Sequence, residues 1–421
     1  MKRLVWGGVL AWALTGAAAA ERLTLEEALA TVTAAHPERR IAESELAIAR
    51  ADREQAASRQ DFSLFLDGSL RRGKRPDGDW KPDNSARIVA RKPLFDFGRT
   101  GQALEAADQD IAARQAELFN VEGLRRIDIM ARFFDVLVAD QQYVADNEFM
   151  TVAFLDWDKA RERFELGIGN RPDLLKLEAH YQDWRERRNA SAQRMRSARE
   201  KLANALYRPG KLPTQLVPPA LEGNARPVPE YDSLLAWVME KNPRVQALQA
   251  QVAAADARLA SIRAERNPVL DAEVVGGGYS REASTRDDVS VGLVFNIPLY
   301  QGGRVDARIA RELALKERRS AELEKLKLDL AEAVLATLQE IEWLRSSARG
   351  AAEKQVEYRD WALERARAEY ELEMKTNLGT SMAETQAAAL RRKQVEYRLA
   401  LALARLEALS GGSLPSAEGA K

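Results

Sequence analysis

Four segments of the chain alternate between apolar and polar residues. The alternation is clearest at 289–297, where Val, Leu, Phe or Ile occupies every odd position. Similar patterns occur at 62–70, 85–94 and 270–275. Because successive side chains of a strand point to opposite faces, these patterns predict four β-strands, each with one apolar and one polar face. Polar segments at 71–84 and 280–287 predict the loops that connect each pair of strands.

Strands of about ten residues with this alternation are typical of outer-membrane β-barrels, with lipid outside and water inside. A soluble sheet packed on helices shows the same alternation, so the pattern alone leaves both alternatives open. In a barrel, the lipid-facing positions are Phe62, Leu64, Leu66, Val289, Val291, Leu293, Phe295 and Ile297. The positions facing the lumen are Ser63, Asp67, Arg87, Arg91, Asp271, Glu273, Ser290 and Asn296.

Four strands cannot close a barrel, and their unpaired edges would be unstable in a membrane. Oligomerisation solves this problem, since three chains of four strands each supply twelve strands, an even number within the known range. The sequence therefore predicts a homotrimer in which each chain contributes four strands.

Long segments with helical periodicity flank the strand pairs, at about 24–60, 99–166 and 305–373. The segment 99–166 contains no proline and, as a helix, would be roughly 100 Å long. In the segment 305–373, apolar residues recur at spacings of three and four on one helix face: Leu323, Leu326, Leu330, Val334, Leu338 and Ile341. Narrow apolar faces on long helices predict coiled-coil packing, and we interpret the dense charges elsewhere as solvated faces.

The chain repeats itself with an offset of roughly 205 residues. Three landmarks recur in the same order: His-Pro at 36–37 and Asn-Pro at 242–243, the joints 93–99 and 298–304, and Phe-Glu-Leu at 164–166 and Tyr-Glu-Leu at 370–372. We therefore predict an internal duplication, with repeats at 21–208 and 230–409, a proline-rich linker at 209–229 and a disordered tail at 410–421.

Composition narrows the function classes. The chain has 64 Lys and Arg against 64 Asp and Glu, which argues against a dedicated nucleic-acid binder. It has no Cys and only two His, His36 and His180, so disulfide frameworks, the usual zinc sites and Cys-based catalysis are excluded. We predict no enzyme activity, no cofactor and no metal site.

The N-terminus resembles an export signal. Lys2 and Arg3 precede an apolar run at 4–14, and alanines at 18–20 provide the small residues that signal peptidase requires. We expect a signal peptide at 1–20, and a retained N-terminal anchor is the alternative. Beyond residue 20 no run of about 18 apolar residues occurs, so membrane insertion would have to use strands.

These features together resemble the TolC family of outer membrane efflux proteins. The resemblance rests on the duplicated unit, the joints Pro-Leu-Phe-Asp-Phe-Gly-Arg at 93–99 and Pro-Leu-Tyr-Gln-Gly-Gly-Arg at 298–304, and Phe-Glu-Leu-Gly at 164–167 followed by Asp-Leu-Leu at 173–175. It implies an α+β membrane protein: a trimeric 12-stranded β-barrel in the outer membrane of a Gram-negative bacterium, continued by an α-helical coiled-coil barrel in the periplasm.

The resemblance also implies a passive outlet of a tripartite efflux pump or type I secretion system, working with a periplasmic adaptor and an inner-membrane transporter. A non-conducting periplasmic coiled-coil adaptor protein remains the alternative. The adaptor would dock on two helical tips, formed by Gly167, Ile168, Gly169, Asn170, Arg171, Asp173, Leu174 and Leu175, and by Lys375, Thr376, Asn377, Leu378 and Gly379. At the second tip Glu373, Gly379 and Met382 replace the family's glycine and aspartates, so an aspartate gate is not expected, and nothing in the sequence identifies the cargo.

Overall fold

A computed structural model describes most of the chain, namely residues 22–74, 78–211, 215–280, 287–372 and 378–415. The expected signal peptide lies outside these residues. The described residues form two compact units. Unit 1 consists of those within Met1–Ala34, Arg126–Asn224 and Leu344–Leu401, and unit 2 of those within Ala35–Arg125, Ala225–Trp343 and Ala402–Lys421. Each unit therefore draws on both of the expected repeats. Within the described part, no helix has the length and apolarity to span a membrane.

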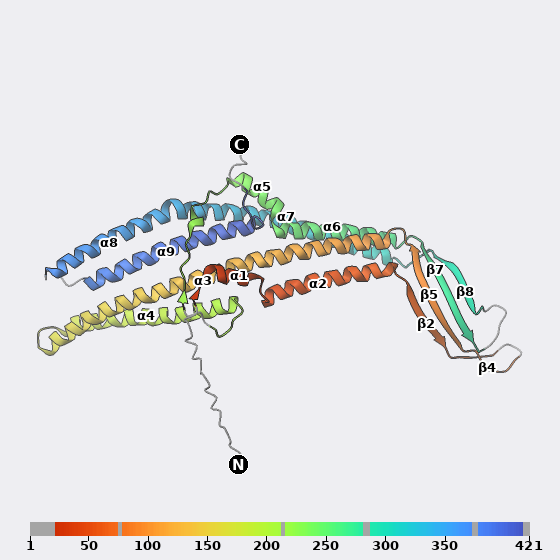
Figure 1. Cartoon of the computed structure of the whole chain (residues 1–421), viewed down its shortest axis with the longest axis horizontal. Coiled ribbons are helices and arrows are strands. Elements are labelled where there is room, and N and C mark those ends of the chain that lie inside the picture. The colour runs from red at the N-terminus through yellow and green to blue at the C-terminus, as the bar shows by residue number, and fades with distance from the viewer. Residues whose placement is uncertain (1–21, 75–77, 212–214, 281–286, 373–377, 416–421) are drawn as a thin grey trace, which may run out of the picture. The chain divides into compact units, whose positions relative to one another are not determined.

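The sheet of unit 2 contains the four predicted strands, which are β2 (Ser63–Ser69), β5 (Ser85–Phe95), β7 (Val269–Tyr279) and β8 (Val289–Asn296). Every neighbouring pair is antiparallel, and the order is β2-β5-β7-β8 (Figure 1). The long central strands lie between two shorter edge strands. The first strand-connecting loop carries an additional short pair, β3 (Arg72–Gly73) and β4 (Lys81–Pro82).

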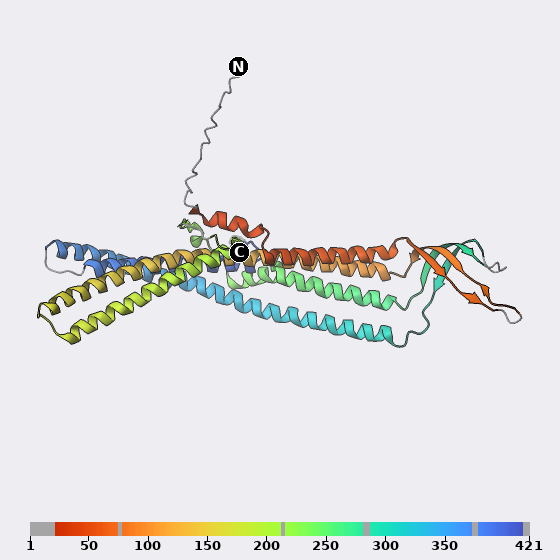
Figure 2. The same cartoon turned by 90° about the horizontal axis from the view of Figure 1, so that it is seen from below.

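Four long helical segments of unit 2 lie next to one another and lead to this sheet (Figure 2). They are α2 (Pro37–Ala57), the first part of α3 (Arg99–Glu165), α6 (Pro243–Ala264) and α7 (Arg304–Trp343). Ion pairs connect α2 to α3 and α6 to α7, for example Arg53 Nε to Asp108 Oδ1 at 2.6 Å and Lys316 Nζ to Asp256 Oδ1 at 2.7 Å. Helix α5 (Tyr231–Lys241) packs on α7 and α6.

The apolar face predicted for the segment 305–373 forms part of the core of unit 2. Leu326, Leu330, Val334 and Ile341 are buried on α7, as their spacing indicated. At the start of α6, buried Asn242 accepts hydrogen bonds from two backbone N–H groups through Oδ1, and its Nδ2 donates to the Leu409 carbonyl at 2.9 Å. This side chain thus caps α6 and holds the C-terminal helix against it.

Unit 1 contains the remainder of α3 with α4 (Arg171–Ala205), α8 (Arg349–Glu371) and α9 (Leu378–Leu409). Contacts give the order α4-α3-α9-α8: Arg199 Nη2 lies 2.5 Å from Asp140 Oδ2 between α4 and α3, and Arg349 Nε lies 3.0 Å from Glu396 Oε1 between α8 and α9. The short helix α1 (Leu25–Ala30) and a parallel pair, β1 (Arg22–Leu23) with β6 (Gln215–Leu216), complete this unit.

Two of the predicted long helices are interrupted. The helix expected at about 24–60 breaks after a 3-10 turn at Thr31–Thr33, because His36 is extended before Pro37 and its side chain caps α2. The segment expected as one helix at 305–373 contains a π-helical turn at Leu344–Ala348, in which Leu344 is fully buried. The start of the expected tail is packed, since the carbonyl of buried Ser410 accepts a hydrogen bond from Trp237.

The core of unit 1 places one aromatic hydroxyl in an apolar setting. Tyr397 is buried and stacks on Phe134 with ring centroids 4.6 Å apart. Burial raises the pKa of this phenol, and its hydroxyl has no hydrogen-bond partner within the described residues. An unsatisfied hydroxyl costs about 1–3 kcal/mol, so Tyr397→Phe should stabilise the protein by about 1 kcal/mol. Thermal denaturation in detergent measures this, and a lower midpoint for the variant would contradict it.

Candidate functional site

The strand register brings the two predicted sets of sheet residues onto opposite faces. Cross-strand pairs unite Leu64, Ala90, Val274 and Val291 in one row, and Leu66, Ile88, Gly276 and Val289 in the next. Leu293 and Phe295 follow on the same face by alternation. Phe62 and Ile297 directly flank the strands and are exposed. The predicted apolar set thus forms a continuous surface.

The opposite face carries the charged residues. Ser63, Arg91 and Glu273 form one cross-strand row with Gly292, and Asp67 pairs with Arg87 in another. Arg91 Nη2 lies 2.6 Å from Glu273 Oε2, and Arg87 Nη2 lies 2.7 Å from Asp67 Oδ2. Alternation places three further members of the predicted polar set on this face, namely Asp271, Ser290 and Asn296. Ionised pairs on one face and aliphatic side chains on the other suit water on one side and lipid on the other.

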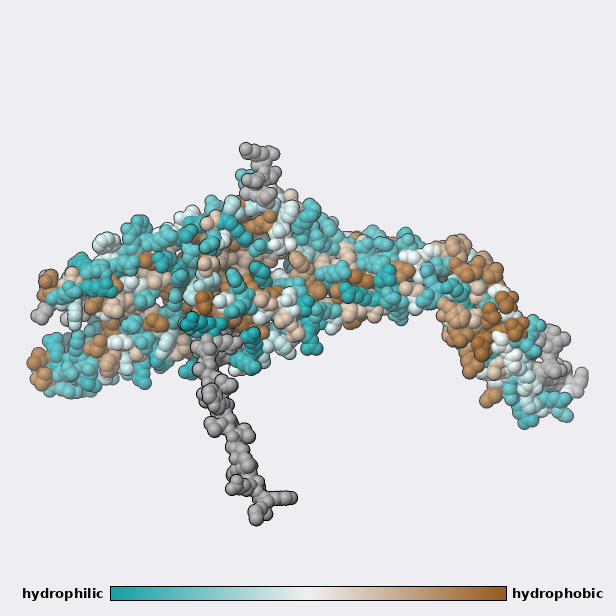
Figure 3. All heavy atoms as spheres, viewed as in Figure 1, coloured by the Kyte–Doolittle hydropathy of each residue, from teal (hydrophilic) through white to brown (hydrophobic). Residues whose placement is uncertain are grey.

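The apolar face is exposed in the single chain. Leu66 and Val291 are 78% and 77% exposed, and every residue of β8 is exposed. Figure 3 shows hydrophobic side chains gathered over the part of the sheet next to the helices, with hydrophilic residues at the distal loops. An exposed apolar surface bordered by polar residues marks a site of membrane or protein interaction.

The two joints between strand and helix share one backbone conformation. Phe97 and Gly98 have φ angles of 53° and 83°, and Gly302 and Gly303 have 61° and 74°. Left-handed backbone is unusual for phenylalanine and easy for glycine. In the first joint the Asp96 carboxylate also accepts a 2.8 Å hydrogen bond from a backbone N–H of the first turn of α3. Both joints therefore reverse the chain in the same way before a long helix starts.

The first predicted tip is a tight turn between α3 and α4. Gly167 has a φ of 77°, its N–H donates to the Phe164 carbonyl at 3.0 Å, and the Ile168 N–H donates to the Arg163 carbonyl at 2.8 Å. This pair of bonds is a Schellman motif, which ends a helix and favours glycine at the left-handed position. Gly167, a member of the first predicted tip, therefore ends α3.

The same tip starts α4 with a polar cap and exposes apolar side chains. Asn170 Oδ1 accepts a hydrogen bond from the Asp173 N–H at 2.9 Å, and Asp173 places a carboxylate at the positive end of the helix. Ile168 and Leu175 are exposed, as is Leu166 at 74%, whereas Leu174 is half-buried. Exposed aliphatic residues on a rigid turn form a surface that a partner can cover.

Only part of the second predicted tip can be placed. Lys375, Thr376 and Asn377 lie outside the described residues, as does Glu373. Leu378 begins α9, and a Cβ on Gly379 would lie 3.0 Å from Val152 Cγ2 of α3. Gly379 thus permits close packing of α9 on α3, a structural role that the sequence did not indicate.

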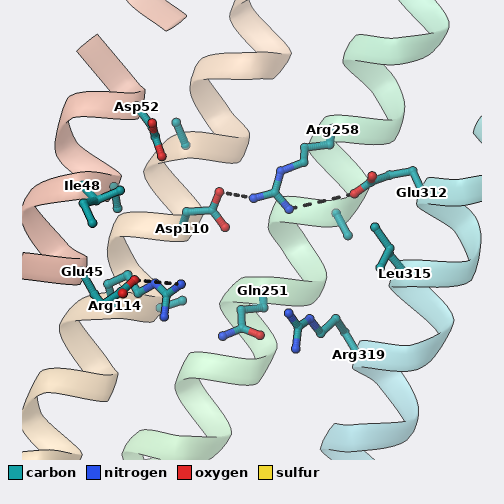
Figure 4. A pocket seen from close by; sticks show the side chains of 14 residues that line it. Glu45, Ile48, Asp52, Asp110, Arg114, Gln251, Arg258, Glu312, Leu315 and Arg319 are labelled. Atoms are coloured by element: carbon teal, nitrogen blue, oxygen red, sulfur yellow. Dashed lines mark hydrogen bonds and ion pairs between the residues drawn. The ribbon is translucent and has the colours of Figure 1, made fainter. Parts of the chain in front are cut away.

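Unit 2 also contains a polar cavity of about 310 Å³ between α2, α3, α6 and α7 (Figure 4). Its charged and amide residues are Glu45, Asp52, Asp110, Arg114, Gln251, Arg258, Glu312 and Arg319. We interpreted such charges from sequence as solvated helix faces. The sequence did contain one signal for the shared cavity, which is a spacing of seven residues between polar residues. This spacing places two residues on the same helix face, and it occurs at 45 and 52, 251 and 258, and 312 and 319.

The two histidines of the chain lie in structural settings. Across the described ranges, no group of three or more His, Cys, Asp or Glu side chains is arranged to hold a metal ion. His36 caps α2, and His180 lies edge-on to Trp184, with ring centroids 6.4 Å apart. Both histidines therefore have local structural contacts.

A two-faced antiparallel sheet joined to long, paired helices is also found in known proteins. Residues 234–412 match the sequence profile of the family described as outer membrane efflux protein. The outer membrane efflux protein BepC of Brucella suis biovar 1 (strain 1330) is 24% identical over 307 residues, which cover 70% of this chain and 65% of that protein. The match thus spans less than two thirds of the length of this curated relative.

Solved structures have the same fold. CusC superposes with a TM-score of 0.74 and 18% identity over 92% of each chain. The outer membrane protein VceC of Vibrio cholerae superposes with a TM-score of 0.70 and 15% identity, over 93% of this chain and 97% of that one. Similarity at this level of identity establishes the fold. The family profile over residues 234–412, together with the shared fold, confirms the resemblance of the chain to the outer membrane efflux proteins.

Proposed function

We propose that the protein is the outer-membrane channel of a tripartite efflux pump or type I secretion system, a passive conduit from the periplasm to the exterior. The observation that carries the proposal is the sheet, in which one face is aliphatic and the other contains the ion pairs Arg91–Glu273 and Arg87–Asp67. Lipid against the first face and water against the second satisfy both sets of side chains.

The channel forms when three chains close one barrel. Strands β2 and β8 are the edges of the sheet in each chain, so in a trimer each β2 pairs with the β8 of its neighbour. Closure removes unpaired backbone groups that a bilayer cannot satisfy. The matching φ angles of the two strand-to-helix joints support an internal duplication, in which each repeat supplies two strands and their helices.

Cysteine crosslinking tests the closure cleanly because the chain has no cysteine of its own. Within one chain β5 and β7 separate β2 from β8, which puts them about 14 Å apart, too far for a disulfide. Phe65→Cys combined with Ser290→Cys, and neighbouring register pairs, should give a ladder of crosslinked species that ends at the trimer. Each single variant is the control. If every cysteine pair gave monomer alone on denaturing gels, the result would contradict the barrel.

The two tips are the proposed docking surface for a periplasmic adaptor. The support is local: the first tip is rigidly closed by its Schellman motif and Asn170 cap, yet it exposes Leu166, Ile168 and Leu175. A rigid turn that presents aliphatic residues loses little entropy on binding. The alternative of a non-conducting periplasmic adaptor leaves the exposed apolar sheet face without a role, so we do not favour it.

A further inference from the structure

The cavity between α2, α3, α6 and α7 has its positive charges already neutralised. Arg258 pairs with Asp110, and Arg114 Nη1 lies 2.7 Å from Glu117 Oε2. Arg319 Nη1 donates to Glu322 Oε2 at 2.8 Å. Each guanidinium that lines the cavity is therefore held by a carboxylate at hydrogen-bond distance.

Several acceptors in the same cavity have no hydrogen-bond donor among the described residues. The Glu312 side chain is only 7% exposed, and its one ion pair within the described chain is with Arg258 Nη1, 4.0 Å away and beyond hydrogen-bond distance. The Gln251 Oε1 atom is buried with no donor among the described residues. Asp52 makes no ion pair or hydrogen bond in that part of the chain, and Figure 4 shows its carboxylate, like those of Asp110 and Glu312, directed at the shared space.

The Glu312 carboxylate is largely buried and has only a distant cation beside it, so a ligand that brings donors and positive charge into the cavity lowers the cost of keeping this carboxylate ionised. We propose that this cavity binds a small organic cation with N–H donors, of the amidinium or guanidinium class, through Glu312 with support from Asp52 and the Gln251 oxygen. A planar N–H fork matches a carboxylate bidentately.

Size and ligand set favour an organic cation over a metal ion. The cavity volume of about 310 Å³ is at the lower end of the range for small-molecule sites. Within the described residues the carboxylates do not converge closely enough to form a metal-binding group. An aromatic amidinium fills this volume and presents its donors at one end.

Fluorescence titration of the purified protein in detergent tests the site with two probes of the same shape. We expect 4-aminobenzamidine to bind at least tenfold more tightly than 4-aminobenzoate, which carries a carboxylate where the first carries an amidinium. Glu312→Gln should weaken amidine binding about tenfold or more. The matched control Glu317→Gln changes an exposed residue of the same helix outside the cavity and should leave binding unchanged.

A second variant covers the case in which Glu312→Gln impairs folding. Asp52 is exposed, so Asp52→Asn should fold normally and weaken amidine binding about threefold. Equal binding of the two probes, or unchanged amidine binding in both variants, would overturn the site.

The role of the site in transport rests on the proposed function and on the cavity opening to the conduit, where a bound cation would obstruct the ion current. In planar bilayers, 4-aminobenzamidine should reduce the current through the wild-type protein and leave Glu312→Gln unaffected. If the protein binds the amidine but conducts no current, the binding site is supported and the proposed conduit is contradicted. If the protein conducts current but does not bind the amidine, the conduit is supported and the proposed binding site is contradicted.

Discussion

Two charges placed on the first tip should abolish export while the protein still folds and assembles. We expect Ile168→Asp combined with Leu175→Asp to reduce export to the level of a host without the protein. Both side chains are exposed, so the variant loses little packing, whereas a docked partner would have to bury two unpaired carboxylates. Ethidium retention in cells lacking their own outlet measures export, and the trimer yield from the same cells measures folding.

A control variant adds the same charges away from the tip. Gln193→Asp with Ser197→Asp changes two exposed neutral residues of α4 and should leave export near wild type. Normal export by the tip variant would show that no partner covers Ile168 and Leu175. Loss of the trimer together with export would instead assign these residues a structural role.

An arginine on the aliphatic face of the sheet should prevent membrane assembly, whereas one on the opposite face should not. Val291 pairs with Val274 in the aliphatic row, and an arginine near the bilayer midplane costs about 2–4 kcal/mol. We expect Val291→Arg to reduce the yield of membrane-inserted trimer at least tenfold. Ser290→Arg, the adjacent residue on the other face, should assemble normally and change the conductance.

Size-exclusion chromatography of detergent extracts gives the trimer yield, and planar-bilayer recording gives the conductance. Similar yields for Val291→Arg and Ser290→Arg would mean that neither face meets lipid. A large loss for Ser290→Arg alone would mean that the faces are reversed.

Local pattern was sufficient to predict the strands and their faces. The alternation of apolar and polar residues depends only on the sequence of each strand. The apolar face could therefore be assigned before the register was known, and it includes Leu64, Leu66, Val289 and Val291. The glycine turn at 167 was equally predictable, because a left-handed helix end has a local sequence signature.

The missed features depend on contacts between distant segments. The parallel pair β1–β6 joins residues more than 190 positions apart, and Gly379 looks like a turn glycine until α3 is known to pack against it. The cavity residues behave in the same way: Glu312 resembles any solvated glutamate until α6 and α7 bury it beside Arg258. The π-helical turn at Leu344–Ala348 contains no proline or glycine from which the sequence could predict it.

The open edges of β2 and β8 have a kinetic consequence. In the proposed trimer the edge strands of each sheet complete their hydrogen bonding with another chain, so the last folding step of each subunit is also its association with the others. The rate of that step then rises with the concentration of newly made chains. At low expression, unassembled subunits persist longer with exposed aliphatic strands, and they depend on holding chaperones or are degraded.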